Sequence, residues 1–310
     1  MLVSYGGVTV GETSQGLFLT EVELDLGDMR TGDAEWPLRH GSRPGVDYLE
    51  SGTLTLTLCS SPGARDDAAA NAAVSEFVRA WRLGLREGPG RLAPLSVSVG
   101  GRSRVVYGRP GRIAPPAPGS NAMKQGVAML TAEFRILDPY VYAADSSDVS
   151  VSVVPKSLGG IVAPVFTPIT TEMTSDTSYR FITVGGDADA PFSVTFHGPC
   201  TDPKVTVDGV EVGIVGRVEY DEDVTVNGRA RTVELADGVP VAARLSRGTR
   251  IDRMTLTPGE HEIAFTATDR TGTATATVSV TPAFYHLLGG CIYGYVACAL
   301  SCGWRVRAFG

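Results

Sequence analysis

The sequence predicts a mainly β fold with one prominent helix, in which an α+β domain is followed by a β-sandwich. Between Thr255 and Val280, apolar and polar residues alternate in two segments, with turn residues ahead of each. Strand-like segments recur about every ten residues from position 179 to 281, which is typical of sandwiches. Residues 66–87 carry the helical period instead. We therefore expect packed sheets over most of the 310 residues, a length sufficient for two separate cores.

Residues 1–145 form the first predicted domain. Its expected strands are Leu17–Leu26, Ser51–Cys59, Leu95–Val99, Arg102–Tyr107 and Val127–Leu137. Gly100-Gly101 joins two of them and predicts a tight hairpin. Asp28–Tyr48 is expected to be a long polar loop that carries Trp36, Arg39, Arg43 and Asp47. We expect Gly111–Ser120 to be a proline-rich loop.

The helix of the first domain is predicted from one apolar stripe within residues 66–87. The stripe consists of Ala70, Val74, Phe77, Trp81 and Leu85. Asp66 and Asp67 suit a helix N-terminus, and Gly88-Pro89-Gly90 ends the pattern. The stripe should face a mostly antiparallel sheet, which is an α+β arrangement. We therefore expect Trp81 to be a core residue.

A linker and a sandwich are expected next. Residues 146–178 are rich in Ser, Thr, Val, Pro and Gly, which favours an extended linker. Residues 179–282 form the predicted sandwich, in which Asp208-Gly209, Asn227-Gly228 and Pro258-Gly259 mark turns. Its expected strands are Tyr179–Val184, Phe192–His197, Val205–Val212, Arg217–Tyr220, Val224–Val226, Arg231–Leu235, Thr255–Leu256, His261–Thr268 and Ala274–Val280. We expect the last two to form the closing hairpin, and regular structure to stop near Thr281.

Residues 283–310 form a Cys-, Tyr- and Gly-rich tail that is uncharged as far as Trp304 and differs from the rest of the chain. From Thr271 to Trp304 there is no Asp, Glu, Lys or Arg. The stretch Phe284–Trp304 approaches the length of a membrane span, but its glycines weaken that interpretation. Docking on its own assembly and lack of order are the favoured alternatives. The N-terminus has neither a basic segment nor a long apolar one, so no secretory signal is expected.

Charge and cysteine content exclude some classes of partner and environment. The net charge is −7 and the isoelectric point is near 5.2, which argues against a surface that coats nucleic acid. The five cysteines form an odd set, which favours free thiols in a reducing compartment.

Catalytic and metal-binding motifs are mostly missing, and we predict no enzyme, no cofactor and no metal. The chain has no phosphate-binding GxxxxGK[ST] loop and no GxSxG turn. His261-Glu262 begins a zinc motif, but Phe265 stands where the second histidine is required, so we expect His261 to be exposed on a strand. His197 and Cys200 lack a second pair of ligands. Cys291, Cys298 and Cys302 match no familiar metal-binding spacing.

Several polar and aromatic residues have a structural as well as a functional interpretation. Asp221-Glu222-Asp223 can contribute to a calcium site, but one acidic run in a turn is usually solvated. A set of arginines can form salt bridges between subunits, can face a glycan, or can be ordinary solvated surface: Arg217, Arg229, Arg231, Arg244, Arg247, Arg250 and Arg253. Trp36, Trp81 and Trp304 are too scattered to predict a sugar-binding platform.

Three sequence features, in this order and spacing, resemble the distal tail protein (minor tail protein) of long non-contractile-tailed bacteriophages, particularly those of actinobacterial hosts. The first is GVDYLESGTLTLTL at 45–58, followed by the helix. The second is AEFRILDPYVYA at 132–143, a closing strand ended by Asp138-Pro139-Tyr140. The third is the linker leading to APFSVTFHGPCTDPKVTVDG at 190–209 and LTPGEHEIAFTATDRTGTA at 256–274. The resemblance covers roughly residues 15–282, and the tail departs from it.

The resemblance implies a structural protein with no catalytic residues. An N-terminal belt domain would oligomerise, usually as a hexameric ring around a channel, and a galectin-like β-sandwich would project outward. The ring would join the tail tube and tape measure protein to hub, tail-associated lysin or receptor-binding proteins. It would lie at the distal end of the virion tail after assembly in the host cytoplasm, and DNA would pass without sequence-specific binding.

Two other functional hypotheses remain open from the sequence. Galectin-like sandwiches can bind sugar, so the alternative is a glycan-binding module of the tail tip that contacts the host cell wall. That alternative requires exposed aromatic residues over a polar groove, and the sequence does not reveal them. An enzyme such as a wall hydrolase would need paired carboxylates, and no pair stands out.

Overall fold

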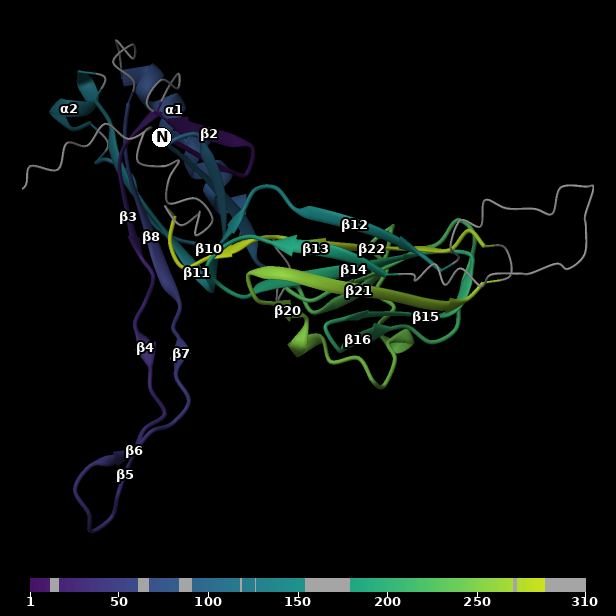
Figure 1. Ribbon diagram of the computed structural model, residues 1–310. Helices are drawn as coiled ribbons and strands as arrows, with labels where there is room; N and C mark the ends of the chain where they lie inside the picture. The colour runs from purple at the N-terminus through teal and green to yellow at the C-terminus, as the bar shows by residue number, and fades with distance from the viewer. Residues whose placement is uncertain are drawn as a thin grey trace, which may run out of the picture. The chain divides into compact units, whose positions relative to one another are not determined.

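A computed structural model of the chain describes residues 1–11, 17–60, 67–83, 91–117, 119–125, 127–153, 179–269 and 272–287 (Figure 1). These residues belong to two compact units. The first is Met1–Ala144 together with 284–287, and the second lies within Asp145–Ala283. Each unit is described by itself.

The first unit contains an antiparallel sheet. Its main strands are β1 (Leu2–Tyr5), β2 (Val8–Gly11), β3 (Leu17–Asp25), β8 (Gly52–Ser60), β9 (Ala93–Val99), β10 (Arg102–Ala114) and β11 (Met129–Ala143). Their order is β2-β1-β9-β10-β11-β8-β3, and the short strand β23 (Ala283–Phe284) pairs with β11. The tight hairpin predicted at Gly100-Gly101 is confirmed, because Val99 pairs with Arg102 and both glycines have positive φ.

Helix α1 (Asp67–Leu83) covers the apolar face of this sheet. Val74, Phe77 and Trp81 are buried as the helical stripe predicts, whereas Leu85 lies outside the described residues. The Trp81 ring lies 5.5 Å from Phe77, and it also meets aromatic rings of the sheet, at 5.1 Å from Tyr5 and 6.0 Å from Phe134. The prediction that Trp81 is a core residue is therefore confirmed. A second helix, α2 (Asn121–Lys124), is a single turn.

Two expectations for strand ends in this unit are wrong. Strand β10 does not end before the proline-rich stretch but continues to Ala114, with a register shift between Pro110 and Ile113. Strand β11 likewise continues through Asp138-Pro139-Tyr140, which form an irregularity rather than an end. The partner strand supplies backbone hydrogen bonds on both sides of each bulge. The strand pairing therefore continues past residues that would locally favour a turn. In addition, strands β1 and β2 are not among the strands predicted from the sequence.

The second unit is a sandwich of two sheets. The first sheet has the order β12-β22-β14-β18-β19, with β20 beside β14, and the second has the order β13-β21-β15-β16, with β17 beside β15. The first sheet comprises β12 (Ser147–Ser152), β14 (Ala190–His197), β18 (Asp223–Asn227), β19 (Thr232–Leu235), β20 (Thr255–Leu256) and β22 (Thr275–Val280). The second comprises β13 (Tyr179–Val184), β15 (Cys200–Val207), β16 (Val210–Gly213), β17 (Arg217–Val218) and β21 (Gly259–Thr268). Short 3-10 helices cover Ala242–Arg244 and Ile251–Arg253.

The sandwich core is formed by the inward-facing residues of both sheets. Every second residue of β14 and of β22 is buried, as period-two alternation predicts. Phe196 of one sheet and Phe265 of the other approach to 6.3 Å between ring centroids, so the two inner faces meet there.

Two details of the sandwich differ from expectation. Strands β21 and β22 do not form a closing hairpin, because β21 pairs with β13 and β15 while β22 pairs with β12 and β14. Alternation marks which face of a strand is buried but not which strand it pairs with. In addition, Ser147–Ser152 lies within the stretch expected to be linker, yet it pairs with β22. Residues 154–178 lie outside the described part of the chain.

The chain also continues in regular structure past Thr281. Phe284 of β23 is buried in the core of the first unit, and the Arg104 guanidinium lies 3.9 Å from the centroid of its ring. The expected end near Thr281 is therefore too early. Cys291, Cys298, Cys302 and most of the possible membrane stretch lie outside the described residues. Within the described part, no helix is long and apolar enough to cross a membrane.

Candidate assembly interface

A two-stranded arm extends from the β3–β8 edge of the first unit (Figure 1). Strands β4 (Met29–Arg30) and β7 (Tyr48–Leu49) continue the β3–β8 ladder, and β5 (Ala34–Glu35) pairs with β6 (Ser42–Arg43) near the tip. We call residues 28–50 the arm. The expectation of a long polar loop is therefore wrong, because the segment is an extended hairpin. Its strands are only two residues long, too short for the alternation by which strands are recognised in sequence.

The arm has no core of its own. Every residue from position 28 to 51 is exposed, although many side chains in this stretch are large and apolar. These exposed apolar residues are Met29, Trp36, Leu38, Val46, Tyr48 and Leu49. A lone two-stranded ribbon is marginally stable in water, and contiguous exposed apolar groups mark surfaces that bind other proteins. The arm therefore has the properties of a segment that is buried by a partner.

Local hydrogen bonds shape the arm. The Asp33 carboxylate accepts a hydrogen bond of 2.8 Å from the Gly45 N–H, and the Asp28 carbonyl accepts one of 3.0 Å from the Glu50 N–H. A Cβ atom at Gly45 would lie 2.1 Å from the carbonyl oxygen of Gly32, so the two strands approach too closely there for any side chain. These contacts determine the path of the backbone without burying apolar surface.

The tip of the arm combines backbone strain with exposure. Leu38 has a φ of 67°, in the left-handed region that bulky residues avoid, and its side chain is fully exposed. Trp36, two residues earlier, is also exposed, and its backbone N–H donates to the Gly41 carbonyl at 3.4 Å. Because the Leu38 side chain is fully exposed, its burial among the described residues does not offset this strain. Strained residues of this kind concentrate at functional sites.

The sandwich presents a second, smaller surface with exposed aromatic residues. Tyr179 and Phe181 lie on the solvent side of edge strand β13, and 59% of Phe181 is exposed. Glu262 of β21 is directly opposite Phe181 in the ladder. Aromatic side chains beside a carboxylate are the kind of groups that a glycan site uses, and the sequence pattern does not reveal that these residues are exposed together. The sequence signal for this surface is the alternation of Tyr179 and Phe181, which places both aromatic side chains on one face of a short strand.

His261 is not exposed, so that expectation is wrong. Only 6% of the residue is accessible, and both ring nitrogens face oxygen atoms. Nδ1 contacts the Asp208 carboxylate, and Nε2 lies 2.6 Å from the Thr257 carbonyl oxygen. The hydrogen bond from His261 lowers the pKa of Asp208. The other Asp208 oxygen accepts from the Glu262 N–H at 3.1 Å, so this cluster ties the β15–β16 turn to β21.

His197 and Cys200 are used separately. His197 Nδ1 lies 2.8 Å from Asp223 Oδ1, and its Nε2 lies 3.0 Å from the Thr277 hydroxyl. Cys200 is buried with a free thiol, and burial, helped by the charge of Asp269, raises its pKa to about 11. Among the residues that the structure describes, no three His, Cys, Asp or Glu side chains come together as metal ligands.

Glu222 and Asp223 of the acidic trio are also engaged within the sandwich, as are Arg217 and Arg244. Arg244 donates to Glu222 at 2.5 Å and to the Arg217 carbonyl, while Asp223 contacts His197. Glu222 and Asp223 thus contact different partners rather than one common cation. Arg217 also pairs with Glu219 at 3.2 Å. Of the three tryptophans, Trp36 lies on the arm and Trp81 in the core, and Trp304 is outside the described ranges.

Comparisons with known proteins reveal likeness of fold at low sequence identity. No family model and no curated protein matches the chain. The chain is similar to the SPP1 Dit (gp 19.1) protein, described as a paradigm of the hub adsorption apparatus in phages that infect Gram-positive bacteria. The identity is 14%, the TM-score is 0.57, and the match covers 91% of this chain and 98% of that one.

The activated baseplate of phage P2 contains similar chains as well. With calcium the TM-score is 0.54, and with strontium it is 0.53, at 10% identity in both. The match covers 91% and 90% of this chain, and 97% and 96% of those chains, respectively. The predicted fold class, mainly β with one prominent helix and a sandwich, is confirmed.

Proposed function

We propose that this chain is a structural subunit of a phage tail tip. Copies of it form a ring, of six subunits in the family that the sequence resembles, which joins the tail tube to the baseplate hub and fibre proteins. The observation that carries the proposal is the arm, whose apolar side chains are exposed in the described part of the chain. The fold likeness to the SPP1 hub protein over 91% of the chain supports it.

The arm suits a contact that repeats around a closed ring. A ring requires a heterologous interface, in which one surface of a subunit meets a different surface of the next. An arm that extends from one edge of its own sheet can reach a neighbour while the neighbour's arm reaches onward. Burial of a side chain such as Leu38 or Trp36 contributes about 1.5–3 kcal/mol each, enough to offset the strain at the tip.

The proposed location and partners follow from this role. The ring lies at the distal end of the virion tail, assembles in the host cytoplasm, and contacts the tail tube and tape measure proteins on one side. On the other side it contacts hub, tail-associated lysin or receptor-binding proteins. The role is structural and non-enzymatic, and the channel lets DNA pass. The net charge of −7, repeated around a channel, would discourage DNA from adhering.

Shortening the arm tests the proposal. Asp28 and Glu50 are joined by a backbone hydrogen bond of 3.0 Å, so residues 29–49 can be replaced by an Asn-Gly turn. Since no arm residue is buried, the shortened chain should fold with an unchanged melting temperature. It should remain monomeric at concentrations at which the native chain forms rings by negative-stain imaging and mass measurement.

A matched control and a contrary outcome make the test decisive. Tyr220→Ala removes an exposed aromatic side chain from the sandwich and should leave the rings intact. A native chain that stays monomeric under assembly conditions, or a shortened chain that still forms rings, would contradict the proposal. Retention of double-stranded DNA by the ring at low salt would contradict the expected channel charge.

The exposed pair on β13 favours one second function, glycan binding by the sandwich. Tyr179 and Phe181 offer apolar faces, and Glu262 offers hydrogen-bond acceptors for sugar hydroxyls. The full chain should then bind host wall polysaccharide saturably, and Phe181→Ala should weaken binding while Tyr220→Ala should not. Equal binding by both variants would remove the support for this function.

A further inference from the structure

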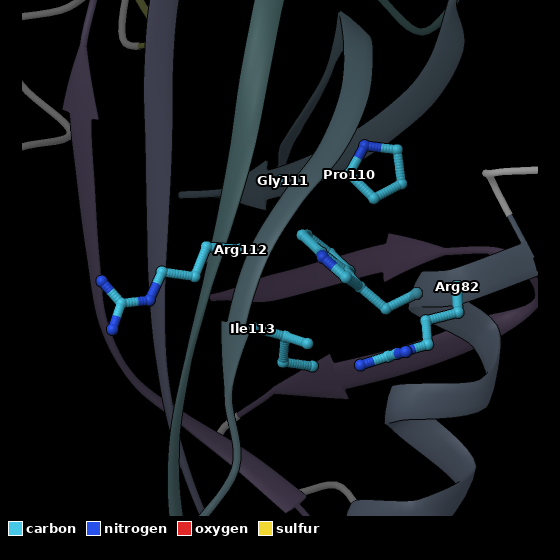
Figure 2. Close-up of a pocket in the computed structure, with 6 residues that line it drawn as sticks. Arg82, Pro110, Gly111, Arg112 and Ile113 are labelled. Carbon is cyan, nitrogen blue, oxygen red and sulfur yellow. The ribbon is translucent and has the colours of Figure 1, made fainter.

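A cavity lies in the first unit between the C-terminal end of helix α1 and the bulged part of strand β10 (Figure 2). Its volume is about 290 Å³, and it is lined by Trp81, Arg82, Pro110, Gly111, Arg112 and Ile113. Known ligand pockets begin near 300 Å³, so this cavity has room for about one aromatic ring with a small polar group. It is distinct from the arm and contains no residue that the proposed function uses.

The bulge in β10 shapes one wall of this cavity. Pro110 pairs with Phe134 and Ile113 pairs with Ala132, so two residues of β10 are opposite the single residue between those partners. The extra residue bends the strand, and such bulges are over-represented next to functional sites because they redirect side chains. Here Arg112 points away from the cavity, whereas Ile113 lies on its wall (Figure 2). Gly111 cannot be replaced by a residue with a side chain unless the backbone shifts, because a Cβ atom would lie 2.8 Å from the Glu133 carbonyl oxygen.

Trp81, one of the residues that line the cavity, has an unused hydrogen-bond donor. Trp81 is 1% exposed, and its indole Nε1 has no hydrogen-bond partner within the described structure. Buried indole N–H groups usually find an acceptor, because an unpaired one loses its hydrogen bond to water without replacement. Trp81 lines the cavity and is otherwise held by aromatic contacts on its ring faces. The cavity therefore adjoins a residue whose indole donor requires an acceptor.

A positive charge lies at the same cavity. Arg82 is exposed, and Figure 2 shows its guanidinium extending toward Ile113 across the cavity. No carboxylate of the described residues lies within ion-pair distance of it. The cavity thus combines apolar walls from Trp81, Pro110 and Ile113 with one neutral donor and one cationic donor. An apolar group that carries a carboxylate complements all three features.

We propose that this cavity is a binding site for an apolar group that bears a carboxylate. The apolar body lies between Trp81 and Ile113, one carboxylate oxygen accepts a hydrogen bond from the Trp81 indole N–H, and the negative charge pairs with Arg82. The same chemistry can come from a free aromatic or aliphatic acid, or from the C-terminal aromatic residue of another protein. Neither source depends on ring formation, so the proposal stands apart from the proposed function.

A single-tryptophan protein gives a direct readout of this site. The sequence has three tryptophans, so Trp36→Phe with Trp304→Phe leaves Trp81 as the sole indole in the full chain. With ¹⁵N-labelled tryptophan, its Nε1–H gives one resonance, whose proton shifts downfield when it donates a hydrogen bond. The two probes are phenylacetate, for a free acid, and the peptide Gly-Gly-Phe, for a protein terminus. Phenylacetamide is the neutral analogue of the first probe.

The site predicts a saturable downfield shift with at least one of the two acids. Arg82→Ala should weaken that binding by about tenfold or more, because charge-assisted hydrogen bonds are among the stronger ones. Arg79→Ala, which changes another exposed arginine of the same helix, should leave binding unchanged. Phenylacetamide should bind to the native site about as weakly as phenylacetate binds to the Arg82→Ala variant.

The outcomes separate the two sources and can overturn the proposal. Binding of phenylacetate alone supports a free acid as the ligand, and binding of Gly-Gly-Phe alone supports a protein terminus. A resonance that neither acid moves would mean that the cavity holds only water, and would overturn the proposal. Equal affinity for phenylacetate and phenylacetamide, or for the native and Arg82→Ala proteins, would overturn it as well.

Discussion

Replacing Leu38 with glycine separates what the arm costs the isolated chain from what it contributes to an assembly. Leu38 has a φ of 67° and a relative exposure of 104%, so its side chain makes no contact that stabilises the monomer. A left-handed conformation costs an L-residue roughly 1–2 kcal/mol, and glycine avoids that cost. Glycine also loses about 0.5–1 kcal/mol more backbone entropy on folding. The free energy of unfolding of the monomer should therefore stay constant or rise by about 1 kcal/mol.

The effect on assembly should have the opposite sign. Fully burying a leucine side chain contributes about 1.5–3 kcal/mol, and glycine cannot supply it. A loss of about 2 kcal/mol at each interface corresponds to a roughly 30-fold weaker association per contact. Since a closed ring contains one such interface per subunit, the losses combine and the ring should form only at much higher protein concentration.

Two measurements on the same samples test this reasoning. Urea unfolding of dilute monomer gives the free energy of unfolding, and mass photometry over a concentration series gives the fraction of rings. Leu38→Ala keeps the unfavourable φ and removes most of the side chain, so it should weaken assembly without stabilising the monomer. A Leu38→Gly protein that forms rings at the native concentration, or whose monomer is destabilised by more than 1 kcal/mol, would refute the argument.

Three further predictions concern the cores of the two units. The hydrogen bond from His261 lowers the pKa of Asp208 below the ordinary aspartate value of 3.8. This carboxylate therefore stabilises the fold above that pH, and the contribution is lost as the pH falls through the lowered pKa. Urea unfolding between pH 5 and 2 should show a smaller loss of stability in His261→Ala than in the native chain, and an equal loss would contradict the contact. With a pKa of about 11, Cys200 should be only about 0.1% thiolate at pH 8, so a variant that retains Cys200 alone should react with a thiol reagent only after unfolding. Trp81→Phe removes the unpaired indole N–H and should change the free energy of unfolding by less than about 1 kcal/mol, whereas Trp81→Ala should cost about 3–5 kcal/mol in calorimetry.

Patterns within single elements were predictable from sequence. The alternation of Leu54, Leu56 and Leu58 identifies one buried face of β8, and the spacing of Phe77 and Trp81 identifies the buried stripe of α1. Both signals depend only on residues close in the chain, because a strand repeats every two residues and a helix every 3.6. The hairpin at positions 100–101 is local in the same sense, since two glycines with positive φ determine its turn.

The candidate sites were not predictable in this way. His261 was expected on an exposed face, and it is buried because Asp208, which lies more than fifty positions earlier in the chain, contacts it across the sheet. The cavity at Trp81 depends on a bulge that arises from the pairing of β10 with β11, within a stretch whose glycine and prolines locally favour a loop.

Composition and periodicity along the chain are enough to identify the apolar residues, the segments that prefer strand or helix, and the faces of those segments that avoid water. Contacts between distant segments place β21 and β22 in different sheets, pair the polar stretch after β3 into an arm, and bring Phe284 into the core of the first unit. The physical reason is the range of the interactions. Propensity and periodicity act between neighbours in the chain, whereas strand pairing, bulges and cavities depend on which distant backbone supplies the hydrogen bonds and which distant side chain fills the space.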